Sequence, residues 1–373
     1  MPPETAAQNQ IGTQQPSLAI LVLTYNHAEY IEQCLLSLLA IEFSNFHIWV
    51  LDDGSTDLTA DLVRRTSDTH GRITLLTQTH SKGRTAQNLQ RLIDVSAGEF
   101  IMFMSGDDML GPAFSAKNII EYLGQNPLTG LVLPRTVPFN QSPTRGSPIV
   151  YDENFLNILQ SGDPKLVCSD HLHRVVSAIF IQGMIIRREL VEECGGFDIE
   201  LTADDYAFVC RLFFLMEKTE WTFKFLPNYF WLYRTHSNNV HKNSVRQIKV
   251  VSETVGKYVP GEFWGAFVWH VPPVQKAEDL PVVEGILLDN LSHEISSKVL
   301  RKVIRRSFEF WFSAGSFSEI KKVFANVEML LVKRFSLITL LLLALPFVSI
   351  RFMSKSRHFS RAVRKLSNFL ERQ

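Results

Sequence analysis

The sequence predicts an α/β fold built on an open, mostly parallel sheet flanked by helices. Short, fully apolar runs alternate with segments of helical spacing, as in right-handed strand–helix–strand units. Polar clusters follow three of the runs: Thr24-Tyr25-Asn26, Asp52-Asp53 and Asp107-Asp108. Ligands of such sheets bind outside the carboxyl ends of the strands, so these clusters mark one expected site.

The parallel strands of this sheet and the helices between them are expected within the first 130 residues. Four short apolar runs have the composition of buried strands: 18–23, 47–51, 73–76 and 99–104. Helical spacing of apolar residues appears between them, at 29–39, about 56–65 and 87–95. Ser55 or Thr56 is expected to cap the second of these helices.

The pattern loosens after residue 127. We expect a loop region at 134–148, an apolar segment at 178–186, helices at 187–194 and 204–216, and an aromatic strand region at 223–233. From about residue 245 onward the chain is expected to be mainly helical. No chemical motif is visible in that part.

Composition and charge are those of an ordinary globular protein. The 373 residues are 46% hydrophobic, and 38 Lys and Arg balance 38 Asp and Glu, which gives no indication of a nucleic-acid partner. The cysteines show neither metal-like spacing nor a disulfide framework: Cys34, Cys168, Cys194 and Cys210. A reducing compartment is the expected environment.

The two ends of the chain differ in character. Residues 1–16 lack the charged and apolar regions of a secretory signal, so we expect a disordered leader and a cytosolic catalytic part. Residues 335–350 are apolar and are followed by basic residues up to 373. Interfacial anchoring at the cytoplasmic face of a membrane is favoured over spanning, and a buried helix is the alternative.

Two acidic pairs at strand ends have side chains suited to metal and nucleotide binding. Paired carboxylates such as Asp107-Asp108 are hard oxygen ligands for Mg²⁺ or Mn²⁺, and a solvated turn is the alternative. Asp52-Asp53 can contact a nucleotide or serve as turn and cap chemistry. Tyr25 offers a ring on which a base can stack, although core or surface tyrosines are commoner.

A second set of candidates lies in the later half of the domain. Asp204-Asp205 begins an expected helix, where acidic residues offset the helix dipole. Alternatively, one carboxylate acts as general base for an attacking hydroxyl. His236 is a candidate ligand of metal or diphosphate, against the commoner structural or surface histidine.

Six stretches in this order and spacing resemble the family 2 inverting glycosyltransferases of the GT-A fold. They are LVLTYNHAEYIEQCLLSLL, VLDDGSTDLT, residues 83–88, AGEFIMFMSGDD, GGFDIELTADDYAFVCRL and YRTHSNN. The resemblance covers residues 18–239, about three-fifths of the chain. It implies a domain at 17–240, with a nucleotide-sugar half at 17–130 and an acceptor half at 131–240. A helical region at 241–334 and the tail at 335–373 would follow.

The resemblance also implies a role for each matching residue. Thr24 and Tyr25 would line the base pocket, and Asp53 would bind the base imide. Asp107 and Asp108 would take the ribose and the metal, which His236 would also reach. Asp205 would be the catalytic base.

Three positions depart from the family pattern. Ser105 stands where the family often has an acidic residue, which leaves the metal motif to the two aspartates that follow. Gln87 replaces a common arginine, for which Arg84, one helical turn away, is the expected substitute. The usual Glu-Asp pair is Asp204-Asp205 here, and the signature of processive polysaccharide synthases is absent.

The expected activity is one inverting transfer from a nucleotide sugar, a uridine diphosphate sugar by default. The expected cofactor is Mn²⁺ or Mg²⁺, and the expected acceptor is a glycan or lipid-linked glycan of the cell envelope. A catalytically inactive nucleotide-sugar-binding or scaffold protein of the same fold is the alternative. A nicotinamide-dependent enzyme is excluded because no G-x-G-x-x-G follows the first strand.

Overall fold

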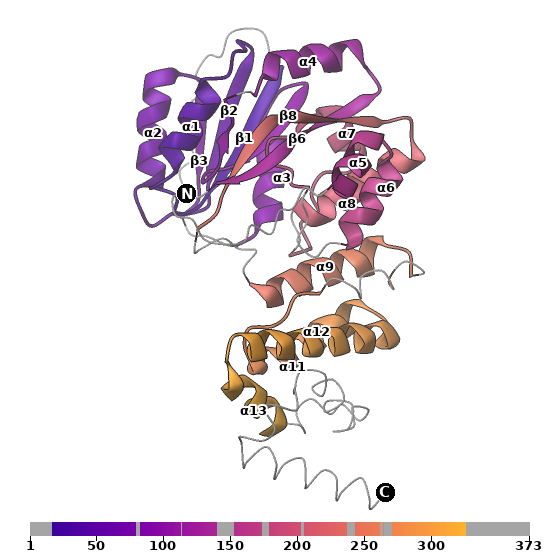
Figure 1. The fold of residues 1–373 in the computed structure, drawn as a ribbon. Helices are drawn as coiled ribbons and strands as arrows, with labels where there is room; N and C mark the ends of the chain where they lie inside the picture. Colours follow the sequence, from indigo (N-terminus) through magenta and orange to yellow (C-terminus); the bar gives the residue numbers. More distant parts are fainter. Residues whose placement is uncertain are drawn as a thin grey trace, which may run out of the picture. The chain divides into compact units, whose positions relative to one another are not determined.

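The structure is a computed structural model (Figure 1). It describes residues 17–79, 83–112, 114–139, 153–173, 179–202, 205–236, 243–261, 264 and 271–325. The expected leader at 1–16, the tail at 335–373 and Asp204 lie outside the described residues. The chain divides into two compact units, Met1–Lys242 with Lys257–Val259, and Asn243–Gly256 with Pro260–Gln373.

The first unit is built on one eight-stranded sheet with the strand order β3-β2-β1-β4-β7-β6-β8-β5. Its first half is parallel and consists of β1 (Leu18–Thr24), β2 (Phe46–Asp52), β3 (Ile73–Thr77) and β4 (Phe100–Ser105). The helices of this half are α1 (Ile31–Leu39), α2 (Thr59–His70) and α3 (Thr85–Val95). The expected α/β class and parallel half-sheet are confirmed.

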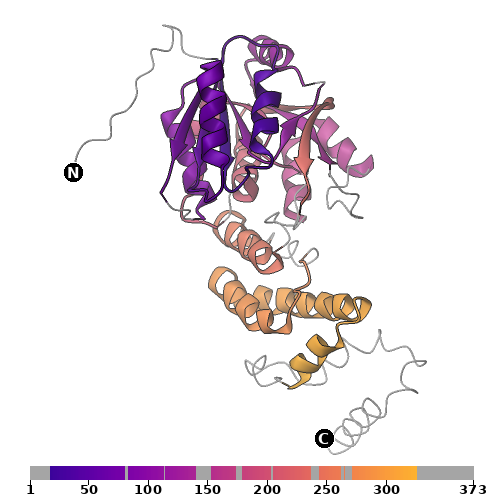
Figure 2. The same ribbon diagram turned by 90° about the vertical axis from the view of Figure 1, so that its left-hand side faces the viewer.

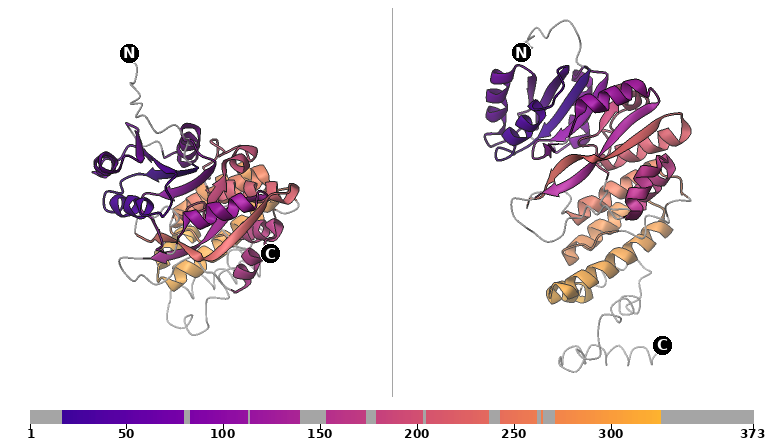
Figure 3. Two further views of the ribbon diagram at one scale, coloured as in Figure 1. Left: turned by 90° about the horizontal axis from the view of Figure 1, so that it is seen from above. Right: turned by 45° about the horizontal axis from the view of Figure 1, so that its top comes forward.

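The second half of the sheet mixes strand directions. Its strands are β5 (Met109–Leu110), β6 (Thr129–Phe139), β7 (Ile185–Arg187) and β8 (Thr222–Arg234). Strand β7 runs antiparallel to β4 and β6, β5 runs antiparallel to β8, and β6 runs parallel to β8. Figure 3 shows the purple N-terminal strands continuing into β6 and β8 as one twisted sheet.

Five further helices complete the first unit. They are α4 (Ala116–Gln125), α5 (Glu153–Ser161), α6 (Pro164–His173), α7 (Arg188–Glu193) and α8 (Asp205–Lys218). The helix expected at 204–216 corresponds to α8, and the one expected at 187–194 to α7. Figure 2 views this unit from the side of α1 and α2.

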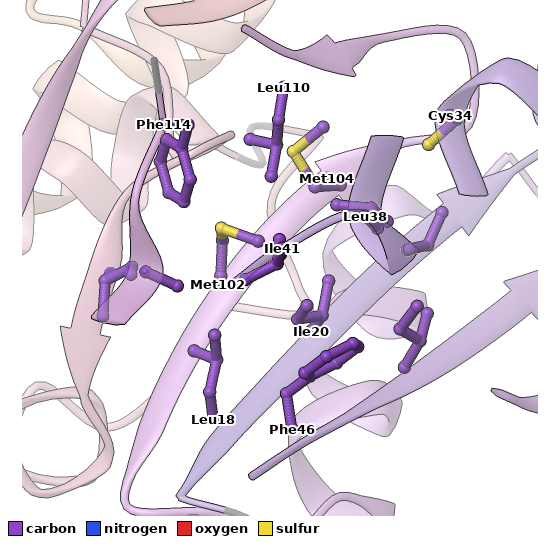
Figure 4. Packing of buried hydrophobic residues seen from close by; sticks show 14 of the residues in the cluster. Leu18, Ile20, Cys34, Leu38, Ile41, Phe46, Met102, Met104, Leu110 and Phe114 are labelled. Carbon is purple, nitrogen blue, oxygen red and sulfur yellow. The ribbon is translucent and has the colours of Figure 1, made fainter. Parts of the chain in front are cut away.

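A continuous apolar core fills the space between the sheet and the helices on one of its faces. Alternate residues of β1 and β4, among them Ile20 and Met102, pack against Leu38 of α1 and against Phe114, which precedes α4 (Figure 4). These side chains are almost fully buried. Their removal from water is the main favourable term for this half of the fold.

The second unit is helical, as expected. Its elements are most of α9 (Ser244–Tyr258), the short 3-10 helix η3 (Ala277–Asp279), α11 (Leu280–Asn290), α12 (His293–Ser313) and α13 (Phe317–Ala325). Among the described residues, none of the helices has both the length and the apolar character to cross a membrane.

The expected cap of the second helix is wrong. Helix α2 begins at Thr59, and neither Ser55 nor Thr56 caps it. The polar groups there are used instead to hold the loop after β1. Ser55 Oγ accepts a hydrogen bond from the Asn26 amide at 2.8 Å, and Asn26 Oδ1 accepts one from the Thr56 amide at 2.8 Å. Asn26 adopts a left-handed φ of 52°, which asparagine tolerates better than most residues.

The close approach of the loops after β1 and β4 requires a glycine at position 106. A Cβ on Gly106 would lie 2.4 Å from Thr24 Oγ1 and 2.7 Å from Thr24 Cβ. We expect Gly106→Ala to lower the free energy of unfolding by about 1–3 kcal/mol through overpacking. The measurement is urea denaturation.

Gly124 in α4 is the matched control, because a Cβ there would meet nothing within 4 Å. Gly124→Ala should leave stability unchanged or raise it by up to about 1 kcal/mol. Equal effects of the two substitutions would contradict the steric argument.

A buried histidine locks α6 to α8. His171 Nε2 lies 3.1 Å from the Tyr206 carbonyl oxygen, and the two rings stack with centroids 4.3 Å apart. A carbonyl can only accept, so Nε2 carries the hydrogen. Burial lowers the pKa of His171 from 6.5 to about 4, an effect that the bond to Tyr206 partly offsets.

This lowered pKa makes stability depend on pH. Between about pH 6.5 and 4 the unfolded chain binds a proton that the folded chain does not, so stability falls as pH falls. Between pH 7 and pH 5 the free energy of unfolding of the parent should fall. In His171→Phe, which keeps an aromatic ring, we expect this fall to be smaller by about 2 kcal/mol. Urea midpoints at both pH values measure this. The exposed His70→Phe serves as control, and a parent-like loss in His171→Phe would refute the assignment.

Candidate active site

Three polar clusters meet at the carboxyl edge of the parallel strands. The Asp53 amide donates to the Thr24 carbonyl at 2.9 Å, which joins the ends of β2 and β1. The Gly106 amide donates to the Leu23 carbonyl at 2.9 Å, which joins the loop after β4 to β1. The structure therefore brings together the clusters that the sequence places at three strand ends.

Asp107 lies at the centre of the site. Its Oδ2 is 2.9 Å from His236 Nε2 and 3.8 Å from His27 Nε2, and its Oδ1 accepts a short hydrogen bond from Ser105 Oγ. Burial would raise the pKa of Asp107, but the bonds from His236 and Ser105 and the charge of His27 leave it below its usual value. Asp107 is therefore a carboxylate with imidazole nitrogens facing one oxygen.

Asp108 is more deeply buried than Asp107, and its side chain faces the backbone of Arg234. Its Oδ1 accepts a hydrogen bond from the Arg234 amide at 2.9 Å, and only 1% of the residue is exposed. Burial, followed by the negative charge of Asp107, raises the pKa of Asp108 well above its usual value. Its contacts are those of a structural acceptor.

Arg234 ties this loop to β8 and α1. Its Nε donates to the Asp107 carbonyl at 2.7 Å, and its terminal nitrogen donates to Gln33 Oε1 at 2.8 Å. The guanidinium lies 4.7 Å from the Tyr30 ring centroid and 4.6 Å from that of Phe139. Such a planar cation is stabilised between aromatic faces when it is buried.

The residues expected to bind the nucleotide lie on β1, β2 and α3. Asp53 is buried, and Gln78 Nε2 lies 3.3 Å from its Oδ1 and 2.7 Å from Asn88 Oδ1. Tyr25 is 43% exposed, so its ring is accessible. Arg84 is exposed at the start of α3, and its guanidinium donates to Gln87 Oε1 at 3.3 Å.

Asp205 is the first residue of α8 and is half-buried. Its charge acts on the Tyr233 hydroxyl, as do the charges of two other carboxylates. Burial raises the pKa of the Tyr233 hydroxyl, and the negative charges of Asp108, Asp107 and Asp205 raise it further. The negative charges of all three aspartates therefore act on one phenol.

Three residues of the site were not predicted from the sequence. His27 lies within a quoted motif, but a lone histidine gives no signal by itself. Arg234 lies in the quoted YRTHSNN segment, but its role depends on hydrogen bonds to Asp107 and Asp108, 126 to 127 positions away in the chain. Gln78 follows β3 directly, and the rule that ligands gather at strand ends would have found it.

The donor atoms at Asp107 fit a divalent cation that takes further ligands from its substrate. Asp107 offers a carboxylate oxygen and His236 an imidazole nitrogen. Phosphate and water oxygens would complete the shell of Mn²⁺ or Mg²⁺. In the described part of the chain, no group of three or more His, Cys, Asp or Glu side chains is arranged to hold a metal ion. The protein would therefore supply only part of the coordination shell.

Comparisons with known proteins match this architecture. Residues 19–195 match the family model described as glycosyl transferase family 2. An uncharacterized glycosyltransferase of Haemophilus influenzae is 29% identical over 111 residues, which cover 30% of this chain and 34% of the relative. The beta-monoglucosyldiacylglycerol synthase of Nostoc sp. is 23% identical over 212 residues, which cover 55% of this chain and 43% of the relative. The matched part is thus less than half the length of each relative.

Two solved structures share the fold. A mannosyltransferase from Pyrobaculum calidifontis, in complex with GDP-Man and Mn²⁺, superimposes with a TM-score of 0.51 at 19% identity, covering 90% of this chain and 89% of that chain. TarS of S. aureus gives a TM-score of 0.52 at 16% identity, covering 81% of this chain and 54% of that chain. Residues 19–195 thus form a glycosyl transferase family 2 domain, and the sheet and its flanking helices form a GT-A fold.

Proposed function

We propose that the protein is an inverting glycosyltransferase that moves a sugar from a nucleotide-sugar donor to a hydroxyl of a glycan or lipid-linked glycan. The single observation that carries this proposal is the Asp107–His236 pair, 2.9 Å apart beside the ends of β1 and β4. Asp205, the first residue of α8, would supply the base. The family membership supports the reaction class.

The nucleotide would bind across the ends of β1 and β2. Asp53 would accept a hydrogen bond from the base imide, with Gln78 holding the carboxylate in place at 3.3 Å. The exposed ring of Tyr25 would stack on the base, and Thr24 would line the pocket. Buried Asn88 Nδ2, which has no hydrogen-bond partner among the described residues, adds a donor next to Gln78.

The diphosphate would lie against Asp107 and His236. These two residues would hold a divalent ion, which when bound offsets charge on the leaving nucleoside diphosphate. Asp107 is the better ligand of the acidic pair, because Asp108 is committed to the Arg234 amide. Arg84, exposed at the start of α3, would add a positive charge on the donor side.

Asp205 would act as the base. A carboxylate oxygen of Asp205 takes the proton of the acceptor hydroxyl while the hydroxyl oxygen forms a bond to the anomeric carbon. The bond from that carbon to the diphosphate breaks in the same step, so the configuration inverts.

The donor and acceptor classes rest on resemblance. A uridine diphosphate sugar is the default donor of the family. Among the matched relatives, one is described as a GalNAc(5)-diNAcBac-PP-undecaprenol beta-1,3-glucosyltransferase of Campylobacter jejuni, at 31% identity over 96 residues. The Nostoc relative is described as a glycolipid synthase. Such acceptors support a place for this protein at the cytoplasmic face of a membrane in cell-envelope synthesis.

An inactive binding protein of the same fold is the competing proposal. Ser105, in place of an acidic residue, is the feature that favours it. Purified protein should be incubated with Mn²⁺ and a panel of nucleotide sugars while nucleoside diphosphate release is followed, with and without a chelator. Metal-dependent release from one donor supports transfer, and metal-dependent binding without release supports the inactive protein.

The base assignment predicts a split between transfer and binding. Asp205→Asn should lower kcat by at least about a hundredfold, because an amide cannot take the proton. The dissociation constant of the bare nucleotide should stay within about twofold, since calorimetry measures a step that does not use the base. Transfer at the parent rate in Asp205→Asn would refute the assignment.

The metal assignment predicts opposite results for two neighbouring substitutions. Asp107→Asn should abolish the gain in nucleotide affinity that Mn²⁺ gives over chelator, because the charged ligand is lost. Asp108→Asn should keep most of that gain, since its amide oxygen still accepts from the Arg234 amide. Calorimetry in both buffers measures the gain. Loss in Asp108→Asn with retention in Asp107→Asn would reverse the assignment.

A further inference from the structure

The loop that leads into α8 is held at both ends by side chains distant in sequence. Gly195 and Gly196 begin it with left-handed φ angles of 77° and 62°. Arg211 of α8 donates to the Gly196 carbonyl at 2.8 Å and to the Cys194 carbonyl. Phe197 stacks on Phe208 of α8, with ring centroids 4.4 Å apart. The first half of the loop is therefore anchored in the core.

The second half of the loop is held from the end of α9. Lys257 Nζ lies 2.7 Å from Asp198 Oδ2 and 2.9 Å from Glu200 Oε2. The Tyr258 hydroxyl donates to the same Asp198 oxygen, and the Tyr258 ring lies 5.2 Å from the guanidinium of Arg211. We call Lys257 and Tyr258 the α9 clamp.

Asp198 differs from the carboxylate of an ordinary surface ion pair. Its side chain is only 9% exposed, and the Glu200 amide adds a third donor at 3.1 Å. Burial would raise the pKa of Asp198, but the bonds from Lys257 and Tyr258 hold it below its usual value. The convergence of three donors on one carboxylate fixes the course of the loop.

The same loop also reaches the donor side. The Phe197 amide donates to Gln90 Oε1 at 2.8 Å, and Gln87 Nε2 lies 3.4 Å from the Ile199 carbonyl. Both glutamines belong to α3, and Gln87 also accepts from Arg84. Ile199 itself is 52% exposed. Loop residues 195–201 therefore contact α3, Phe208 and Arg211 of α8, and the α9 clamp.

We propose that Lys257 and Tyr258 are positioning residues for transfer, holding the 195–201 loop and through it the α8 start that carries Asp205. This inference rests on the proposed function. The clamp lies outside residues 19–195, the part that matches the family model. It is expected to act on the arrangement of acceptor and base more than on the nucleotide pocket, whose residues Tyr25 and Asp53 lie at the ends of β1 and β2.

The variants for the test are Lys257→Met, which keeps the aliphatic stem, Tyr258→Phe, which keeps the ring over Arg211, and their combination. Lys257→Arg retains the cation and should restore the parent behaviour. Lys298→Met removes a comparably exposed lysine, whose Nζ lies 2.6 Å from Glu294 in α12, and is the control. Full-length protein is used throughout.

Two readouts separate positioning from general loss of structure. In the combined variant, kcat should fall by about tenfold or more, because small misplacements of reacting groups are costly. Affinity for the bare nucleotide should stay within about twofold, and thermal unfolding should remain cooperative, which would show that the fold is retained. Amide hydrogen exchange should accelerate at 195–202 and stay unchanged in β2.

Each outcome decides one question. Parent-like kcat and exchange in the combined variant, with an active parent, would overturn the clamp and leave the proposed function standing. A parallel loss of nucleotide affinity, kcat and melting temperature would also overturn it, because it would mean a purely structural role. A parent that transfers from no donor would refute the proposed function, and the positioning role would fall with it.

Discussion

A buried guanidinium is the constraint on which the candidate site depends. The two adjacent carboxylates of Asp107 and Asp108 repel each other and lose solvation at the end of β4. Arg234 supplies the compensating charge, with 2% of its surface exposed. It binds Asp108 through its backbone amide and the Asp107 carbonyl through its side chain. Burial of charged groups costs free energy, and hydrogen bonds of this geometry offset that cost.

The division of labour between the two aspartates follows from this arrangement. Since Arg234 and β8 engage Asp108 from within the fold, Asp107 is left to face His236 and His27. The Ser105 hydroxyl then donates to Asp107. An acidic side chain at that position would instead add a third negative charge. The serine is thus compatible with a site at which the substrate supplies the remaining negative charge.

The spacing of apolar residues predicted the parallel half of the sheet well. Buried strands appear in the sequence as short apolar runs, and the helices between them show helical spacing. The three polar clusters could be placed together for the same reason. In the mixed half, the strand region expected at 223–233 corresponds to β8. Strand β6 was missed because it continues to Phe139, where a loop was expected, and β7 was missed because it is only three residues long and pairs with strands distant in the chain. The start of α2 was misplaced because Ser55 and Thr56 satisfy the loop after β1 instead of the helix.

The site residues likewise fall into those that motifs predict and those that depend on tertiary contacts. Asp107 and His236 were expected from motifs, whereas the contribution of Arg234 and the imidazole of His27 depend on side-chain geometry. A single sequence does not record which of two neighbouring aspartates is turned inward. That choice is made by the packing of β8 against the loop after β4.

Helix α9 has a consequence for how such a chain can be modified in evolution. Its residues up to Gly256 belong to the helical unit, whereas Lys257–Val259 belong to the first unit. One helix therefore carries residues of both units, and the boundary between them is not a linker. Recombination that exchanged the C-terminal region between relatives would also exchange the residues that hold the 195–201 loop. The two units are thus constrained to be inherited together.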